Sequence, residues 1–175
     1  MKKFWMLAAA IFALSCSSDD SADDNQSSVK VDGQKYTYEH LLMSDASDFP
    51  LSDADAKTTY FYLVEPVPCS GAPCSRPVGM SITIVQPLGQ TSLEGTYQFT
   101  PGTIPRANVY DHKSQSQSGA GSVTVTRLDN GEYELRFSED ATLVNQGFAR
   151  SLKGKVKGNF EVIPFDYRTG NGQTN

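Results

Sequence analysis

Short segments in which apolar and polar residues alternate dominate the chain from residue 29 onward. Met80, Ile82 and Ile84 alternate with other residues across 80–85, and residues 58–64 are rich in aromatic and β-branched side chains. Period-two alternation predicts strands with one buried face, and such side chains favour strands. Segments of this kind also cover residues 29–38, 95–100, 122–137 and 150–165. The pattern predicts an all-β domain of seven or eight strands over residues 29–165.

The turn residues predict how neighbouring strands connect. Asn130-Gly131 separates two alternating segments, and Asp32-Gly33 separates two others. Both dipeptides are typical of two-residue hairpin turns, so we expect antiparallel hairpins at both places. Gly154 and Gly158 interrupt the last alternating segment and predict a bulge or a sharp bend there. A single antiparallel barrel fits these hairpins, and a two-sheet β-sandwich is the alternative.

Three segments depart from the strand pattern. Leu41-Leu42-Met43 resembles the start of a helical turn, although it lacks the length of a stable helix. Residues 102–121 include a run of Ser and Gln and predict a polar loop. Residues 166–175 predict a flexible C-terminal tail.

The first 15 residues have the features of a secretion signal. Lys2 and Lys3 precede an apolar run over residues 4–14, which is shorter than the roughly 20 residues that span a bilayer. Ala13-Leu14-Ser15-Cys16 resembles the lipobox of bacterial lipoproteins. That resemblance implies cleavage before Cys16 and acylation of its thiol, which anchors the protein to a membrane. The other interpretation is an ordinary signal peptide that happens to contain a cysteine.

An acidic run follows Cys16 and extends the resemblance. Residues 16–28 have low hydrophobicity and high charge, and they predict a disordered tether. Ser17-Ser18-Asp19-Asp20 is similar to the surface-export signal of Bacteroidota-type lipoproteins. This implies a lipid-anchored protein on the outer face of the cell outer membrane, with the periplasmic face as the alternative.

The charge of the chain bears on its partners. Loss of residues 1–15 changes the net charge from −5 to −7. This negative balance argues against nucleic acid or anionic lipid as a partner, since both bind patches of Lys and Arg. The expected contact with the membrane is the N-terminal lipid alone.

The remaining two cysteines lie in one Pro/Gly-rich segment. Cys69 and Cys74 are separated by four residues that can reverse the chain, and an exported protein meets an oxidising compartment. We expect a Cys69–Cys74 disulfide. A metal site here would need a second Cys or His pair, and neither His40 nor His112 provides one, so we expect no metal and no cofactor.

Short motifs in three strands carry a resemblance of fold. Gly95-Thr96-Tyr97, Gly121-Ser122-Val123-Thr124-Val125 and the glycine-rich segment 152–158 are similar to the small calycin-like or lipocalin-like domains of uncharacterised Bacteroidota lipoproteins. The resemblance covers roughly residues 29–162 and implies a calycin-like barrel. Fold by itself does not imply function.

Candidate chemical groups are sparse. Asp45, Asp48, Asp53 and Asp55 offer oxygen ligands for a cation, but their spacing is not that of a calcium loop, and a solvated loop is the simpler interpretation. His112 follows Asp111 without a nucleophile motif, so we expect no catalytic residues.

Lysines and tyrosines are the remaining candidates. Lys153, Lys155 and Lys157 share one face of a strand, where they either bind an anion or protect an edge or solvent face from aggregation. Tyr60, Tyr62 and Tyr97 are the candidate ligand-binding residues, because tyrosine rings stack on sugars or apolar ligands. Packing within the sheet is the other role for these rings.

Together these observations predict a non-enzymatic binding or accessory module for a small molecule, a glycan or a protein. The alternative is a structural lipoprotein of the envelope that docks a protein partner.

Overall fold

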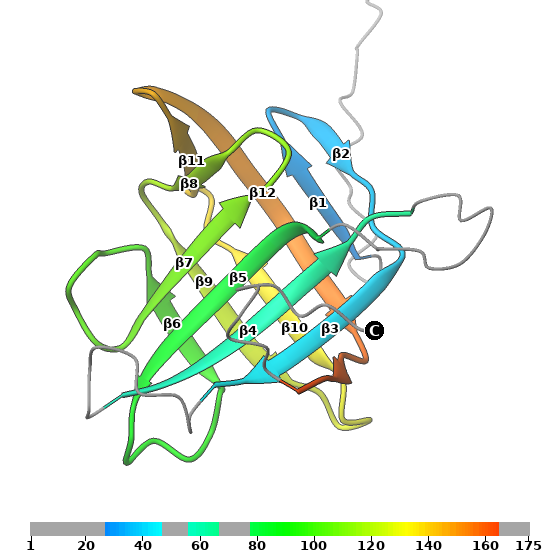
Figure 1. Ribbon diagram of the computed structural model, residues 1–175, viewed down its shortest axis with the longest axis vertical. Coiled ribbons are helices and arrows are strands. Elements are labelled where there is room, and N and C mark those ends of the chain that lie inside the picture. Colours follow the sequence, from blue (N-terminus) through cyan, green and yellow to red (C-terminus); the bar gives the residue numbers. More distant parts are fainter. Residues whose placement is uncertain (1–26, 47–55, 67–77, 165–175) are drawn as a thin grey trace, which may run out of the picture.

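The chain folds as a single β-sheet. The computed structural model describes residues 27–46, 56–66 and 78–164, and within these ranges every regular element is a strand (Figure 1). The predicted all-β class is therefore confirmed. In the described part of the chain, no helix has the length and hydrophobicity to cross a membrane.

The strands follow one another along the chain as β1 (Ser28–Val31), β2 (Gln34–Tyr36), β3 (His40–Asp45), β4 (Ala56–Val64), β5 (Val78–Pro87), β6 (Gly95–Gln98), β7 (Arg106–Asp111), β8 (Ser116–Ser118), β9 (Ser122–Arg127), β10 (Tyr133–Phe137), β11 (Thr142–Asn145), β12 (Phe148–Gly158) and β13 (Glu161–Val162). Their order in the sheet is β13-β3-β4-β5-β7-β6-β9-β10-β12-β1-β2, and β8 and β11 form a second connection between β7 and β12.

The sheet has more strands than the alternation predicts, and it is mixed. Two long strands are each broken in the middle: residues 119–121 separate β8 from β9, and residues 138–141 separate β10 from β11. The breaks face each other, because Thr142 N donates to Ala120 O and Ser138 N donates to Ser122 O. Two pairings are parallel, β13 with β3 and β6 with β7. The prediction of a purely antiparallel sheet is therefore wrong.

Two further predictions are corrected. The segment Leu41-Leu42-Met43 lies in β3, because six consecutive residues of this strand pair with β4, and this pairing outweighs a helical preference. Residues 102–121 are not a continuous loop, since β7 and β8 lie within them. In β7 the buried side chains are Ala107, Val109 and Asp111, and the polar residues between them hide the alternation.

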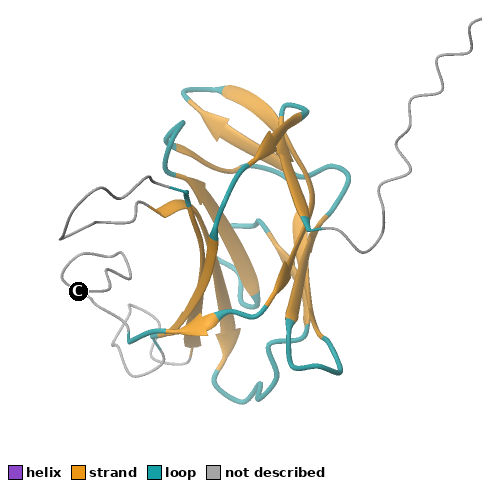
Figure 2. Ribbon diagram, turned by 90° about the vertical axis from the view of Figure 1, so that its right-hand side faces the viewer, coloured by secondary structure: helices purple, strands orange, loops and turns teal. Residues whose placement is uncertain are grey.

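The core lies between two layers of the curved sheet. β3, β4, β5 and β7 form one layer, which faces β9, β10, β12 and β1 (Figures 1 and 2). Apolar side chains at alternate positions point between the layers and are almost fully buried; they include Phe61, Leu63, Ile82, Ile84, Val109, Val123, Val125, Leu135, Leu152 and Val156. Each such side chain contributes about 1.5–3 kcal/mol on burial.

The hairpins form where the turn residues predict them. Asp32 and Gly33 have φ values of 50° and 76° and join β1 to β2. In the other hairpin, Gly131 has a φ of 85°, and Leu128 N donates to Glu132 O beside the β9–β10 pairing.

β12 lies inside the sheet and not at its edge. It pairs with β10 and β11 on one side and with β1 on the other. β1 approaches β12 closely at Gly154, where φ is +98° and a Cβ atom would lie 2.0 Å from Ser28 O. The glycine in this strand is thus required by the backbone conformation and by the neighbouring strand.

We predict that Gly154→Ala lowers the free energy of unfolding by about 3 kcal/mol, because it adds a clash with β1 to the cost of a positive φ. Gly131→Ala is the matched control, since its φ is +85° and nothing lies within 4 Å of the added atom. The control should cost only about 1–2 kcal/mol. Urea unfolding followed by fluorescence measures both, and equal losses would contradict the close approach.

Candidate functional site

The outward side of β4, β5 and β7 carries polar and aromatic side chains in register. Tyr60 of β4 pairs with Thr83 of β5, and Thr83 pairs with Asn108 of β7. These positions form a row across three strands, opposite to the buried face. Because alternate residues share a face, the next outward row consists of residues two positions away along each strand.

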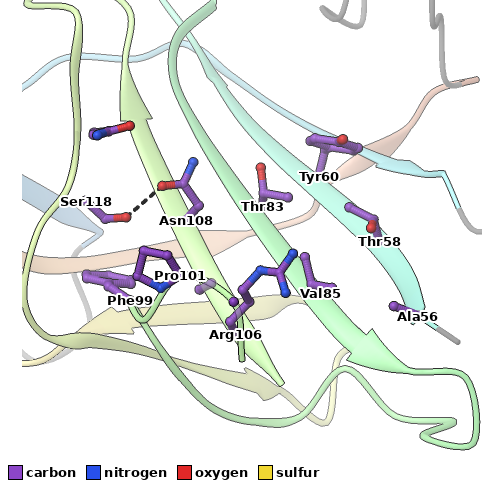
Figure 3. Close-up of a pocket in the computed structure, with 13 residues that line it drawn as sticks. Ala56, Thr58, Tyr60, Thr83, Val85, Phe99, Pro101, Arg106, Asn108 and Ser118 are labelled. Carbon is purple, nitrogen blue, oxygen red and sulfur yellow. Dashed lines mark hydrogen bonds between the residues drawn. The ribbon is translucent and has the colours of Figure 1, made fainter. Parts of the chain in front are cut away.

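The second row is Thr58, Val85 and Arg106, which are likewise opposite one another in β4, β5 and β7. The two rows form the floor of a hollow of about 490 Å³. Figure 3 shows Tyr60, Thr83 and Asn108 side by side across the three strands. The hollow is completed by residues from the β6–β7 connection and from β8, namely Phe99, Pro101, Gly102, Gln117 and Ser118. We call this hollow the outer groove.

The groove exists because β7 is incompletely paired on one side. On that side β6 pairs with β7 only at Arg106, and β8 pairs only at Tyr110 and Asp111. Between these pairings the side chain of Ser118 substitutes for a strand, since its Oγ accepts a hydrogen bond from Val109 N at 3.2 Å. The hydroxyl also donates to Asn108 Oδ1 at 2.8 Å and so orients the Asn108 amide (Figure 3).

The groove is a hydrogen-bonding surface with two aromatic rings, Tyr60 and Phe99, and one cation, Arg106. Hydroxyl and amide groups come from Thr58, Thr83, Asn108 and Gln117. Arg106 lies in the same wall, and its Nη1 donates to Thr103 O at 3.0 Å. No carboxylate lies among the described residues that line the groove, although the chain as a whole has a net charge of −5.

The three candidate tyrosines occupy different environments. Tyr60 lines the groove, and its ring is parallel to that of Tyr62, with centroids 6.0 Å apart and an interplanar angle of 3°. Tyr62 is buried in a second apolar cluster with Leu42, Val64 and Ile163 on the outward side of the sheet. Tyr97 points into the core of the protein, away from the other two.

Tyr97 holds the β5–β6 connection. Its hydroxyl donates to Leu93 O at 2.8 Å and accepts from Gln86 Nε2 at 2.8 Å and from Gln90 Nε2 at 3.2 Å. Burial raises the pKa of Tyr97 above its ordinary value, against the opposite effect of the two glutamines. These contacts assign Tyr97 a role in packing.

His112 lies beside a hydroxyl group but lacks the rest of a catalytic arrangement. Its Nε2 is 3.2 Å from Ser81 Oγ, and its ring meets Tyr110 edge-on with centroids 4.8 Å apart. Burial lowers the pKa of His112, and the charge of Asp111 acts in the opposite direction. Within the described residues, no carboxylate is bonded to Nδ1, and Asp111 itself is turned into the sheet.

Asp111 belongs to a polar network at one end of the sheet. It is buried, and it accepts hydrogen bonds from Lys113 N and from the Ser114 hydroxyl. Arg150 lies between Asp111, at 3.8 Å, and Asp32, at 2.9 Å. The side-chain hydrogen bond from Arg150, together with the one from Ser151 N, lowers the pKa of Asp32. The network thus links β7, β12 and the β1–β2 turn.

Most of the remaining sequence candidates cannot be located in the described part of the chain. Cys16, Cys69 and Cys74 lie outside the described residues, as do Asp48, Asp53 and Asp55. Asp45 ends β3, and His40 begins it, with Nε2 3.5 Å from Glu39 Oε1. Over the described ranges, no group of three or more His, Cys, Asp or Glu residues is arranged to hold a metal ion.

Sequence reasoning missed most residues of the outer groove. Arg106, Asn108, Gln117 and Ser118 all lie in the segment interpreted as a loop. The available signal for a strand here was the alternation of Ala107 and Val109 with polar residues. An alternation over only six residues also arises by chance, so it does not identify a strand by itself.

Comparison with models of protein families, with curated proteins and with solved structures gave no match to this chain.

We predict that Tyr97→Phe lowers the free energy of unfolding by about 1–2 kcal/mol, because Leu93 O and two glutamine amides lose a partner. Tyr110→Phe is the control, since it removes the same atom from a half-exposed ring on the outward face of β7. Thermal unfolding of the two variants measures the difference. Equal stability of the two variants would contradict a packing role for the Tyr97 hydroxyl.

Proposed function

We propose that this protein is a lipid-anchored, non-enzymatic binding module whose outer groove holds a carbohydrate. The observation that carries the proposal is the composition of the groove. An aromatic ring, Tyr60, lies in register with the hydroxyl of Thr83 and the amide of Asn108 on a concave surface of about 490 Å³.

The chemistry of a sugar fits this surface. One face of a pyranose ring presents C–H groups that pack on an aromatic ring, and its hydroxyls pair with amide and hydroxyl side chains. An apolar ligand would favour a site lined mainly by hydrophobic side chains. The groove instead mixes both kinds of group, and Arg106 adds a donor suited to a carboxylated or sulfated sugar.

The curvature of the sheet and the path of its last strands also bear on whether the sheet is closed. We infer that the curved sheet closes as a calycin-like barrel. The direct passage of the chain from β12 to β13 supports this, because β13 pairs with β3 and so joins the last part of the sheet to the first. Such a barrel would differ from a ligand-enclosing one, since aromatic and aliphatic side chains pack between its layers.

The anchor is inferred from the N-terminal segment. The lipobox-like sequence at Cys16 supports acylation, and the acidic residues that follow support display on the cell surface. The described structure begins at residue 27, so at most about 40 Å of extended chain separates Cys16 from β1. The domain would then be held close to the membrane, where polysaccharides of the surroundings reach the groove.

A glycan array probed with the chain from residue 16 onward tests the binding function, since this chain contains every described strand. We expect binding to at least one class of polysaccharide. Tyr60→Ala should weaken that binding about tenfold or more, because loss of a central aromatic contact typically costs more than 1 kcal/mol. Isothermal titration with the selected oligosaccharide measures the affinity.

The matched control is Phe148→Ala, which also removes an aromatic side chain from the surface. Phe148 is 78% exposed at the start of β12 and does not line the groove. Its loss should leave the affinity unchanged. Absence of any bound polysaccharide, or equal weakening by both variants, would refute the proposed site.

The anchor has an independent test. We predict that the full chain, expressed in a Gram-negative host fed a clickable fatty acid, incorporates the label and that Cys16→Ser abolishes it. Cys69→Ser is the control and should retain the label, because that cysteine is remote from the lipobox-like sequence. Labelled Cys16→Ser protein would show that the acyl chain is not on Cys16.

A further inference from the structure

The outward face of β1, β2, β10 and β12 is strongly basic, in contrast to the outer groove. Lys35 of β2 pairs with Lys30 of β1, and Lys30 pairs with Lys153 of β12. Three lysines therefore lie directly opposite one another across three neighbouring strands. The next positions of the same face hold Lys155, which pairs with Arg136, and Lys157, which pairs with Glu134. We call these six cationic residues the basic face: Lys30, Lys35, Arg136, Lys153, Lys155 and Lys157.

One carboxylate partly neutralises this face. Glu134 Oε2 is 3.2 Å from Lys155 Nζ, and Glu134 Oε1 is 3.1 Å from Arg136 Nη2. Burial alone would raise the pKa of Glu134, but hydrogen bonds from Lys155 and Arg136 outweigh it and lower the pKa. In the described part of the chain, no carboxylate lies within ion-pair distance of Lys30, Lys35, Lys153 or Lys157.

Folding accounts for Lys155 and Arg136, which pair with Glu134. It does not account for the row formed by Lys35, Lys30 and Lys153. Like charges directly opposite each other in a sheet are destabilising, so a row of three lysines costs stability. Protection of a sheet edge does not explain Lys153, Lys155 and Lys157 either, since β12 is flanked by strands on both sides. The basic face thus has a cost that binding of an anionic partner would offset.

The position of the face points to the kind of partner. The described chain begins at Ser27, whose Oγ accepts a hydrogen bond from Lys157 N at 2.9 Å. Lys30 follows only three residues later. The N-terminal segment that carries Cys16 therefore joins the domain at the basic face, and a lipid at Cys16 would hold this face near the membrane.

We propose that the basic face rests on the phosphate groups of the membrane that holds the lipid anchor. The inference depends on the lipid anchor proposed above but not on the outer groove. Loss of residues 1–15 leaves a net charge of −7, so a protein with this basic face has a strong charge asymmetry. An anionic surface attracts the lysines and repels the remainder of the domain, so the tethered protein turns its basic face toward the headgroups. The net negative charge argued against anionic lipid as a partner. The basic face changes that expectation, because net charge carries no information on how the charges are distributed.

The outer groove gains an orientation from this contact. β4, β5 and β7 belong to the layer opposite to β1, β10 and β12 (Figures 1 and 2). With the basic face on the membrane, the outward side of β4, β5 and β7 is directed away from it.

The experiment uses the full lipidated protein, purified in detergent and reconstituted in two kinds of vesicle. One contains phosphatidylcholine alone, and the other also contains phosphatidylglycerol. Amine-reactive labelling followed by peptide mass spectrometry reports the reactivity of each lysine. Lys30 and Lys153 should react about fivefold more slowly in the anionic vesicles, because each lysine at an anionic surface gains about 1 kcal/mol. Lys57 of β4, in the opposite layer of the sheet, is the internal control and should not change.

Variants and salt show whether contact with the anionic membrane is what protects the lysines from labelling. Lys30→Gln with Lys153→Gln should abolish the protection of Lys35 and Lys157, whereas Lys57→Gln with Arg127→Gln changes the net charge equally and should preserve it. Salt at 1 M should remove the protection, because the Debye length falls to about 3 Å. Circular dichroism of the variants checks that they are folded.

The experiment distinguishes failure of the membrane contact from failure of the lipid anchor. Failure to float with phosphatidylcholine vesicles refutes the lipid anchor, whereas flotation with equal lysine reactivity in both vesicles refutes the membrane contact. Inorganic phosphate or heparin added to phosphatidylcholine vesicles serves as the remaining comparison. Protection by either of them without protection by phosphatidylglycerol would assign the face to a soluble anion or an acidic polymer and overturn the proposal.

Discussion

The packing of inward side chains between the two layers of the sheet is the constraint on which the rest of the structure depends. Phe61, Ile82, Val123, Leu152 and their neighbours are almost entirely buried there. A sheet whose interior is occupied by its own core has two places left for chemistry, its outward faces and its ends. Both candidate surfaces of this protein are outward faces. Strand alternation therefore does two things at once, since every second residue builds the core and the residues between them build the surfaces.

The two outward faces differ because their cross-strand rows differ. On β4, β5 and β7 the rows join an aromatic ring, hydroxyls and an amide, as in Tyr60, Thr83 and Asn108. On β1, β2 and β12 one row joins three lysines. Neither set is contiguous in the sequence, and each arises from pairing between distant strands. The net negative charge of the chain conceals this separation, because acidic residues elsewhere outnumber the lysines of the basic face.

Sequence reasoning succeeded where a local signal was strong and failed where the signal came from partners. The alternation of Met80, Ile82 and Ile84 and the Asn130-Gly131 turn depend on neighbouring residues, and strands and a hairpin form there. β3 was missed because Leu and Met also favour helices, and only its pairing with β4 decides its conformation. The outer groove could not be predicted, because it depends on the register of β4, β5 and β7 and on the gap beside β7 that Ser118 partly fills.

The lysines of β12 also show what strand pairing adds to a prediction from the sequence. Their spacing shows from the sequence that Lys153, Lys155 and Lys157 share a face, but their environments differ once the partners are known. Lys155 is 7% exposed and bonded to Glu134, whereas Lys153 is exposed and opposite Lys30. Along β12, a buried lysine in an ion pair thus lies two residues from an exposed lysine in a row of like charges. The ion pair anchors β12 to β10, and that rigid pairing holds Lys153 opposite Lys30, which repels it. The stability of the pairing between strands is therefore what allows the protein to keep a concentrated positive charge on one face.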